Sequence, residues 1–320
     1  MQENINETSI DKKYMGATGA NRFLLITLLC YMGSSFVLQL LANLLGGKIP
    51  FLSDTLFLLL AGQIALVVPA IVFFVKNKIN VTEFLRIKRM HPITWILIIV
   101  FSYASYPIIS LCNYLSLQVS ENVIDGTMQD ILEKYPIAIC VIAVALIPCM
   151  VEETIFRGVM YQSYKRAGFF KALFMTAILF GFFHMNINQM SYAIVIGLLF
   201  VCLNEATGSI LSSIFMHFII NGTSILSSAA IYKRYGSLQV ETTENMLSSG
   251  SIVRYLVIAS VFCVAILALL LYAMMKIEHR DEIVAALTKP TQEKERMLSP
   301  ALVVVLVICV AMMALSQISF

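Results

Sequence analysis

The stretch IPCMVEETIFR, residues 147–157, places Glu152, Glu153 and Arg157 in a run that is otherwise apolar enough to cross a membrane. Ionisable side chains at that depth are costly unless they pair or face a wet cavity, so they mark a candidate functional site. On a helix, Glu153 and Arg157 lie one turn apart and can form an ion pair. Glu152 points about 100° away from Glu153 and is left free. The stretch therefore predicts one supporting carboxylate, Glu153, and one candidate general base, Glu152.

The composition extends this membrane character to the whole chain. Hydrophobic residues make up 59% of the 320 residues, charged residues make up 13%, and the mean hydropathy is +0.85. A soluble chain of this kind carries roughly a quarter charged residues. Most of the apolar surface is therefore expected to face lipid instead of one water-excluding core.

Segments long enough to cross a bilayer recur along the sequence, since a transmembrane helix needs about 20 apolar residues. The predicted spans lie at 22–45, 51–75, 93–119, 136–162, 170–187, 190–206, 209–231 and 253–276, with the shorter segment 301–320 as a ninth candidate. The predicted fold class is all-α: a polytopic membrane protein with 8–9 transmembrane helices and its active site within the helix bundle.

Basic residues gather in the connections on one side of the predicted bundle. The N-terminal tail and the connections 76–91, 163–171 and 276–299 hold most of the 22 Lys and Arg residues. The other side holds Lys48, Lys134, Lys233, Arg234 and Arg254. By the positive-inside rule the first set faces the cytoplasm, with the N-terminus inside and the C-terminus outside. The abundance of Ile, Asn and Lys indicates AT-rich bacterial DNA, so the expected location is a bacterial cytoplasmic membrane.

The acidic segment from Glu121 to Lys134 leads into the glutamate helix. It is predicted to be a solvated connector; the alternative is a gate or a substrate-contacting element on the outer face. The seven cysteines show no CxxC pair and no metal-ligand spacing, so they are interpreted as apolar packing residues.

Two of the four histidines lie in apolar spans. His91 and His279 fall in charged connections and are expected to be solvated. His184 ends the run FGFFH, and His217 begins the run HFIIN, which puts Asn221 on the same helical face. Either histidine alone could be an interhelical hydrogen-bonding group. Together with the glutamates, however, three helices each bring polar groups into the bilayer, and one shared cavity would satisfy them all.

The predicted spans put Glu152 and His184 at different depths. If the two side chains meet, helix 136–162 must be longer or more tilted than its apolar run suggests. Pro148, one turn before the glutamates, could also kink this helix and open a water-accessible cavity.

A glutamate, two histidines and an asparagine in an apolar cavity suggest amide hydrolysis. Glu152, assisted by a histidine, could deprotonate water, and a donor such as Asn221 could stabilise the oxyanion by about 3–4 kcal/mol. A zinc site is the alternative, with Glu152, His184 and His217 as ligands. The HExxH spacing is absent, and no Ser or Cys stands at a recognisable nucleophile position.

The motifs Glu152-Glu153-x-x-x-Arg157, Phe180-x-x-x-His184 and His217-x-x-x-Asn221 resemble those of the CPBP intramembrane proteases. That family includes the type II CAAX prenyl endopeptidases and bacterial relatives tied to bacteriocin processing and immunity. The resemblance covers roughly residues 130–230, which would form the catalytic transmembrane domain. It would follow a tail, 1–21, and N-terminal helices, 22–129, and precede C-terminal helices, 231–320.

The resemblance implies a role for each motif residue. Glu152 and His184 would activate the water, and His217 and Asn221 would form the oxyanion hole. Glu153 and Arg157 would support the site. Family members are often labelled metalloproteases; a glutamate-type mechanism without bound metal is preferred here, with zinc left as a possible cofactor.

The leading hypothesis is an intramembrane endopeptidase acting on a membrane-associated peptide or protein. The substrate is left open between a prenylated CAAX tail, a bacteriocin or pheromone precursor and a membrane-protein segment. The alternatives are a proton-coupled transporter and a non-proteolytic immunity or scaffold protein that retains the fold. Membrane lipid is an expected partner and nucleic acid is not, since the basic residues lie in short juxtamembrane loops. The oligomeric state does not follow from the sequence.

Overall fold

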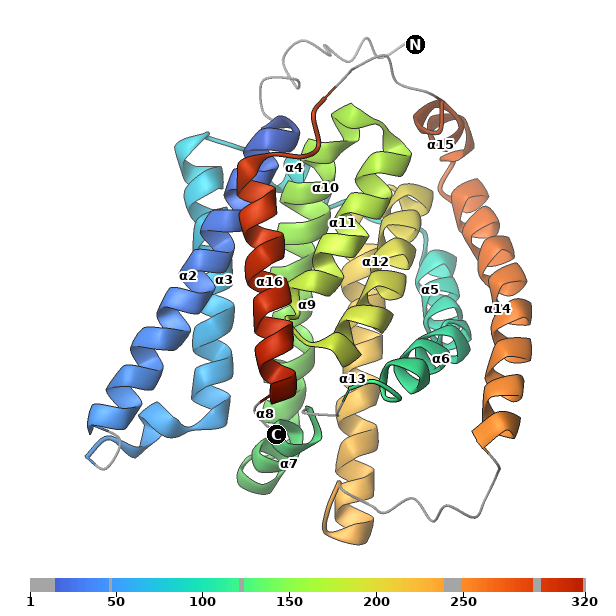
Figure 1. Cartoon of the computed structure of the whole chain (residues 1–320). Helices are drawn as coiled ribbons and strands as arrows, with labels where there is room; N and C mark the ends of the chain where they lie inside the picture. The colour runs from blue at the N-terminus through green and yellow to red at the C-terminus, as the bar shows by residue number, and fades with distance from the viewer. Residues whose placement is uncertain (1–14, 46–47, 121–123, 239–248, 290–294, 319–320) are drawn as a thin grey trace.

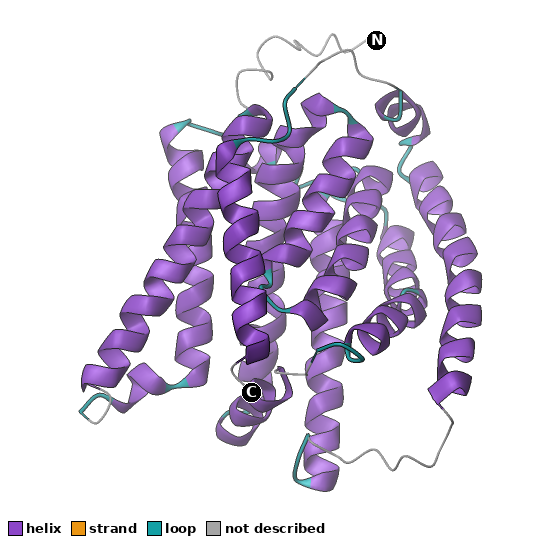
Figure 2. Cartoon of the chain, in the orientation of Figure 1, coloured by secondary structure: helices purple, strands orange, loops and turns teal. Residues whose placement is uncertain are grey.

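The computed structural model describes residues 15–45, 48–120, 124–238, 249–289 and 295–318. Within these residues the chain forms helices and no strand (Figure 1, Figure 2). Eight of the described helical segments are long and apolar enough to cross a membrane. The chain is therefore an all-α polytopic membrane protein, as its sequence predicts.

The first half of the chain supplies the helices that surround the site. They are α2 (Gly16–Leu45), α3 (Thr55–Lys76), α4 (Val81–Phe84), α5 (Pro92–Ala104), α6 (Tyr106–Ser116) and α7 (Ile124–Lys134), with a 3₁₀ turn at Pro50–Ser53 before α3. The second half continues with α11 (Phe169–Phe183), α12 (Ile187–Thr207), α13 (Ile210–Tyr235), α14 (Ser249–Ile277), α15 (Asp281–Leu287) and α16 (Pro300–Ile318).

Between these halves runs one 31-residue helical segment, Ile137–Ala167, here called the central helix. It consists of α8 (Ile137–Val141), α9 (Ile147–Glu153), α10 (Tyr161–Tyr164) and a final 3₁₀ turn (Lys165–Ala167), with π-helical turns at Ile142–Leu146 and Thr154–Met160. The predicted span 136–162 was therefore too short. Pro148 lies two residues after the first π-helical turn, and because proline has no N–H it removes one regular hydrogen bond of the helix there.

Two of the predicted spans differ in length from what the sequence indicates. The segment predicted at 170–187 is α11, a helix of only 15 residues, which is shorter than a usual span. The C-terminal segment, predicted as the shorter ninth candidate, is a full-length candidate at Pro300–Gln317. The predicted span extended to residue 187, but His184 and Asn186 interrupt the apolar run just after Phe183, where the helix ends.

The predicted span 93–119 is also divided. Helix α5 ends at Ala104, and α6 begins at Tyr106 and changes direction (Figure 1). Pro107 lies in the first turn of α6, where no hydrogen bond from its backbone nitrogen is needed. In a continuous helix from α5 the same proline would remove one i→i−4 hydrogen bond. An apolar run alone does not reveal such a break.

The segment predicted as a solvated connector forms α7 and packs on the bundle, so that expectation was wrong for the part that is described. Its Met128 and Ile131 are buried in a small apolar cluster with Leu56 of α3 and Ile225 of α13. Residues 121–123 lie outside the described part of the chain. Alternating acidic and apolar residues made α7 look like a surface element, but one face of it is covered.

The basic connections lie together, as predicted. The described parts of 76–91, 163–171 and 276–299 are all at the upper end of the bundle in Figure 1, with α4, α10 and α15, while α7 and α8 lie at the lower end. Helices α2 and α16 both start at the upper end (Figure 1).

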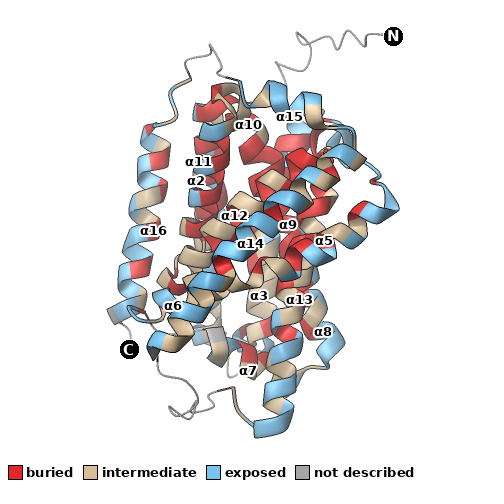
Figure 3. Ribbon diagram, turned by 90° about the vertical axis from the view of Figure 1, so that its right-hand side faces the viewer, coloured by how far each residue is buried: buried red, intermediate tan, exposed pale blue. Residues whose placement is uncertain are grey.

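Buried side chains concentrate around the central helix, α11 and α12, whereas α14 and α16 are largely exposed along their length (Figure 3). Phe156, Phe180 and Phe200 belong to the main apolar core. The exposed side chains of α14 are themselves apolar, with Val261 and Phe262 each 67% exposed. Such a surface is expected where a helix faces lipid.

Candidate active site

Glu153 and Arg157 form a buried ion pair within the central helix. Arg157 Nη1 lies 3.0 Å from Glu153 Oε1, and neither side chain has any exposed surface. The carbon at the centre of the guanidinium lies 4.2 Å from the ring centre of Phe180 and 4.7 Å from that of Phe200. Aromatic faces stabilise a desolvated cation through their negative π surfaces. The pairing predicted from helical spacing is thus confirmed, and two aromatic rings complete the surroundings of the arginine.

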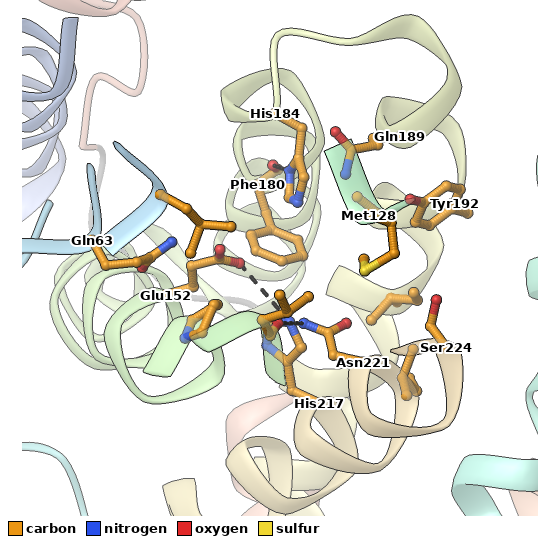
Figure 4. A pocket seen from close by; sticks show the side chains of 16 residues that line it. Gln63, Met128, Glu152, Phe180, His184, Gln189, Tyr192, His217, Asn221 and Ser224 are labelled. Atoms are coloured by element: carbon orange, nitrogen blue, oxygen red, sulfur yellow. Dashed lines mark hydrogen bonds and ion pairs between the residues drawn. The ribbon is translucent and has the colours of Figure 1, made fainter. Parts of the chain in front are cut away.

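The Glu153 carboxylate also holds an imidazole from a distant helix. His217 Nδ1, on α13, lies 3.1 Å from the same Glu153 Oε1. The other ring nitrogen, Nε2, lies 3.9 Å from Glu152 Oε2 (Figure 4). The two neighbouring glutamates therefore approach opposite nitrogens of one histidine. The spacing of residues in the sequence did not predict this contact.

The two glutamates differ in how far they are buried. The side chain of Glu152 is 18% exposed, whereas that of Glu153 is fully buried. Glu152 lines a cavity of about 240 Å³ between α3, α7, the central helix, α11, α12 and α13. The division between a buried supporting carboxylate and an accessible one, inferred from helical geometry, is present in the structure.

The same cavity brings together the other polar residues of the three motifs. His184, His217 and Asn221 line it together with Glu152 (Figure 4). Glu153 and Arg157 are not among its lining residues and lie behind it. Glu152 and His184 line the same cavity in spite of the depth difference that their predicted spans imply.

His184 occupies the C-terminal end of α11, where it is the cap residue. Its Nδ1 lies 2.8 Å from the carbonyl oxygen of Phe180, one turn earlier, which fixes the ring orientation. Helix α11 lies so close to α12 at Gly181 that an added Cβ would stand 2.5 Å from Ile194 Cγ1. This close approach brings His184 to the cavity wall.

Asn221 contacts a backbone carbonyl of the central helix that lies one turn before a proline. Its Nδ2 donates to the carbonyl oxygen of Val144 at 3.5 Å. In a regular α-helix this oxygen would accept from the N–H of residue 148, but Pro148 has none. Pro148 therefore does not compete with Asn221 for this carbonyl.

The sequence did not single out several side chains that line this cavity. Gln63 of α3 and Gln189 and Tyr192 of α12 face it, as does Met128 of α7 (Figure 4). A signal for Gln63 was available, because it is the only polar side chain between Thr55 and Lys76 in an otherwise apolar helix. For Met128, no pattern in the sequence indicates contact with the site.

A second buried acid lies outside the cavity. Glu205, in the last turn of α12, has only 2% of its side chain exposed. Its Oε1 lies 2.5 Å from Arg86 Nη1 and 3.1 Å from Lys165 Nζ, and its Oε2 lies 3.5 Å from Arg280 Nη2. The cluster ties the connection before α5, the end of the central helix and the connection after α14 to one residue. It is a structural junction at the basic end of the bundle.

The predicted zinc ligands do not form a metal-binding cluster. Among the described residues, no three His, Cys, Asp or Glu side chains are placed so that they could hold a metal ion. Of the proposed ligands, His184 directs Nδ1 to the Phe180 carbonyl, and His217 directs Nδ1 to Glu153. These contacts orient the two rings and leave each Nε2 available, so what speaks against a zinc site is only that the three described side chains are not grouped as ligands of one ion.

Comparison with known protein families agrees with the three motifs. Residues 134–223 match the model of a family described as "Type II CAAX prenyl endopeptidase Rce1-like". The resemblance noted from the motifs is confirmed over this segment. The Rce1-like segment contains all six predicted site residues, while Gln63 and Met128 lie before it. The family supports a protease-type enzyme. No curated protein and no solved structure matches the chain.

Proposed function

We propose that this protein is an intramembrane endopeptidase that hydrolyses a peptide bond of a membrane-associated peptide or protein. The observation that carries the proposal is the approach of Glu152, a carboxylate that water can reach, to His217 within a cavity formed by membrane helices. The Rce1-like match over the same helices supports it.

In this proposal Glu152 and His184 activate the attacking water. With Nδ1 donating to the Phe180 carbonyl, a neutral His184 has an acceptor at Nε2. A water between Nε2 and the Glu152 carboxylate can give its proton to Glu152 as its oxygen attacks the carbonyl carbon. The carbonyl π electrons move to oxygen and form the oxyanion. When the intermediate collapses, the C–N bond breaks and the departing nitrogen takes the proton from Glu152.

His217 and Asn221 stabilise the oxyanion. When His217 is protonated, both ring nitrogens are donors: Nδ1 donates to Glu153 and Nε2 is free for the oxyanion. The charges of Glu152, Glu153, Arg157 and protonated His217 then cancel, which suits a desolvated site. Asn221 uses one N–H for the Val144 carbonyl and keeps the other for the substrate. Removal of one such donor typically costs about 10²–10³ in kcat.

We place the basic end of the bundle, with α4, α10 and α15, in the cytoplasm, following the positive-inside rule. The protein would then lie in a bacterial cytoplasmic membrane with α7 on the outer side. Because α7 contributes Met128 to the cavity wall, the substrate would meet the site next to this helix.

The test is a cleavage assay with purified protein in liposomes. The probes are a farnesylated peptide ending in Cys-aliphatic-aliphatic-X, its unmodified form, and a library of random ten-residue peptides. We expect cleavage by the wild type and a loss of about 10²–10⁴-fold in Glu152→Gln and in His184→Ala. The control is Glu282→Gln, an exposed acid on α15. Full activity of Glu152→Gln would overturn the proposed base. Proton-coupled solute uptake without cleavage would instead indicate a carrier.

A further inference from the structure

Gln63 of α3 is a buried polar group that the proposed chemistry does not use. Its Oε1 is buried and accepts no hydrogen bond from any described residue. A buried acceptor without a partner costs about 1–3 kcal/mol, so such groups are rare. In a helix that is otherwise apolar from Leu56 to Val75, a carboxamide without a structural role suggests a functional one.

The position of Gln63 links it to the proposed reaction. Gln63 lines the catalytic cavity and also a second cavity of about 170 Å³, and Glu152, Phe180, His184 and Gln189 line both. The two cavities therefore meet at the proposed base. In Figure 4 the carboxamide of Gln63 lies beside Glu152, on the side away from Asn221.

The backbone of α3 is held firmly at this point. An added Cβ at Gly62 would lie 3.0 Å from Cε2 of Tyr31, so α2 and α3 are in close contact there. Tyr31 itself lines the second cavity. This close packing of α3 on α2 at Gly62 positions the next residue, Gln63, at the wall of both cavities.

The second cavity is mainly apolar beyond the residues that it shares with the first. The additional lining side chains are Tyr31, Leu66, Phe156, Phe183 and Met185. A substrate segment that runs from Glu152 into the second cavity would place an apolar side chain in that cavity. Its backbone N–H and C=O groups would need partners, because such groups are costly to leave unpaired away from water.

We propose that Gln63 binds the backbone of an apolar substrate residue next to the scissile bond. Its Oε1 would accept from a peptide N–H, and its amide N–H₂ can donate to a neighbouring carbonyl. The proposal rests on the proposed endopeptidase function and extends it: the substrate is an extended peptide with an apolar residue on the Tyr31 side of the cut. Gln63 lies on α3, which precedes the Rce1-like segment in the sequence.

The experiment is an N-methyl scan of the library peptide that the wild type cleaves fastest. Each backbone N–H near the cut is replaced in turn by N–CH₃, and kcat/KM is measured for the wild type and for Gln63→Leu, in which leucine suits a membrane helix. We expect one position at which methylation slows the wild type about tenfold, the value of one hydrogen bond, and does not slow Gln63→Leu further. Gln63→Leu should raise KM more than it lowers kcat, and Gln63→Asn should restore part of the difference.

A matched control and a side-chain comparison sharpen the result. Ile64→Ala changes the neighbouring residue on α3, whose side chain is 63% exposed, and should leave kcat/KM unchanged. At the position found by the scan, aspartate in place of the apolar residue should abolish cleavage. If methylation at every position slows the wild type and Gln63→Leu equally, the assignment of Gln63 is overturned while the endopeptidase stands. If the wild type cleaves none of the peptides, both proposals fall.

Discussion

His217 Nδ1 lies 3.1 Å from Glu153 Oε1, the same oxygen that lies 3.0 Å from Arg157 Nη1. The Glu153 carboxylate therefore pairs with Arg157 of its own helix and also connects the central helix to α13. It orients the imidazole so that Nε2 faces the accessible neighbour, Glu152, at 3.9 Å. The supporting ion pair is thus part of the arrangement that positions the proposed oxyanion donor, and changes in it should affect both folding and chemistry.

Arg157→Ala should destabilise the protein strongly. It leaves the Glu153 carboxylate buried with only His217 beside it and opens a gap between Phe180 and Phe200. Breaking a buried pair on one side costs about 3–5 kcal/mol, so the temperature of unfolding in detergent should fall by roughly 10 °C. Lys134→Ala is a matched control, since Lys134 and Asp130 have the same spacing on an exposed surface. Equal unfolding temperatures for the two variants would contradict the assigned role of Arg157.

Pro148→Ala should weaken catalysis without weakening the fold. The new backbone N–H of residue 148 can donate to the Val144 carbonyl and would compete with the hydrogen bond from Asn221 Nδ2. Asn221 becomes free to move, and kcat should fall by about tenfold, less than the about 10²–10³-fold expected for Asn221→Ala. The check is kcat and unfolding temperature for the single variants and for the double variant. If the two effects on kcat multiply independently, Pro148 does not act through Asn221.

Cleavage should not depend on a bound metal ion. Because the described side chains do not provide a common set of metal ligands, incubation with a chelator should leave kcat/KM unchanged, and added zinc should not increase it. The measurement is cleavage of the best library peptide before and after chelator treatment and dialysis. Activity that is lost with chelator and regained with zinc would show that Glu152, His184 and His217 rearrange around a metal.

Glu205→Gln should destabilise the basic end of the bundle and leave the chemistry intact. Glu205 is the shared partner of Arg86, Lys165 and Arg280, which would then repel one another. Burial and the charge of Arg86 already hold the pKa of Arg280 below its ordinary value. A loss of about 2–4 kcal/mol is expected, seen as a lower unfolding temperature. The kcat of the folded fraction should match the wild type.

A second substitution tests the cause of that instability. Removing one cation in Glu205→Gln/Arg280→Gln should recover part of the unfolding temperature, because it reduces the repulsion among the cations that remain. If the double variant is less stable than Glu205→Gln alone, repulsion among these cations does not account for the loss.

Local relationships within single helices could be predicted from the sequence. The one-turn spacing puts Glu153 beside Arg157 and His217 on the face of Asn221, whatever surrounds them. The membrane class follows from apolar runs of sufficient length. The breaks were predicted less well: α5 and α6 separate near Pro107 within one apolar run, and α11 ends at Phe183, short of the predicted end at residue 187. Hydropathy measures how apolar a segment is and not where its backbone changes direction.

By itself, the sequence determined that the chain crosses a membrane through helices, that Glu153 pairs with Arg157, and which motif residues are candidates for one site. Only the tertiary structure decided that His217 reaches Glu153 across 64 positions, that Asn221 meets the Val144 carbonyl, and that Gln63 and α7 join the cavity. The physical reason is that the helical period fixes angles within a helix. The rotation and depth of one helix against another depend instead on how similar apolar side chains pack, as at Gly181 and Gly62.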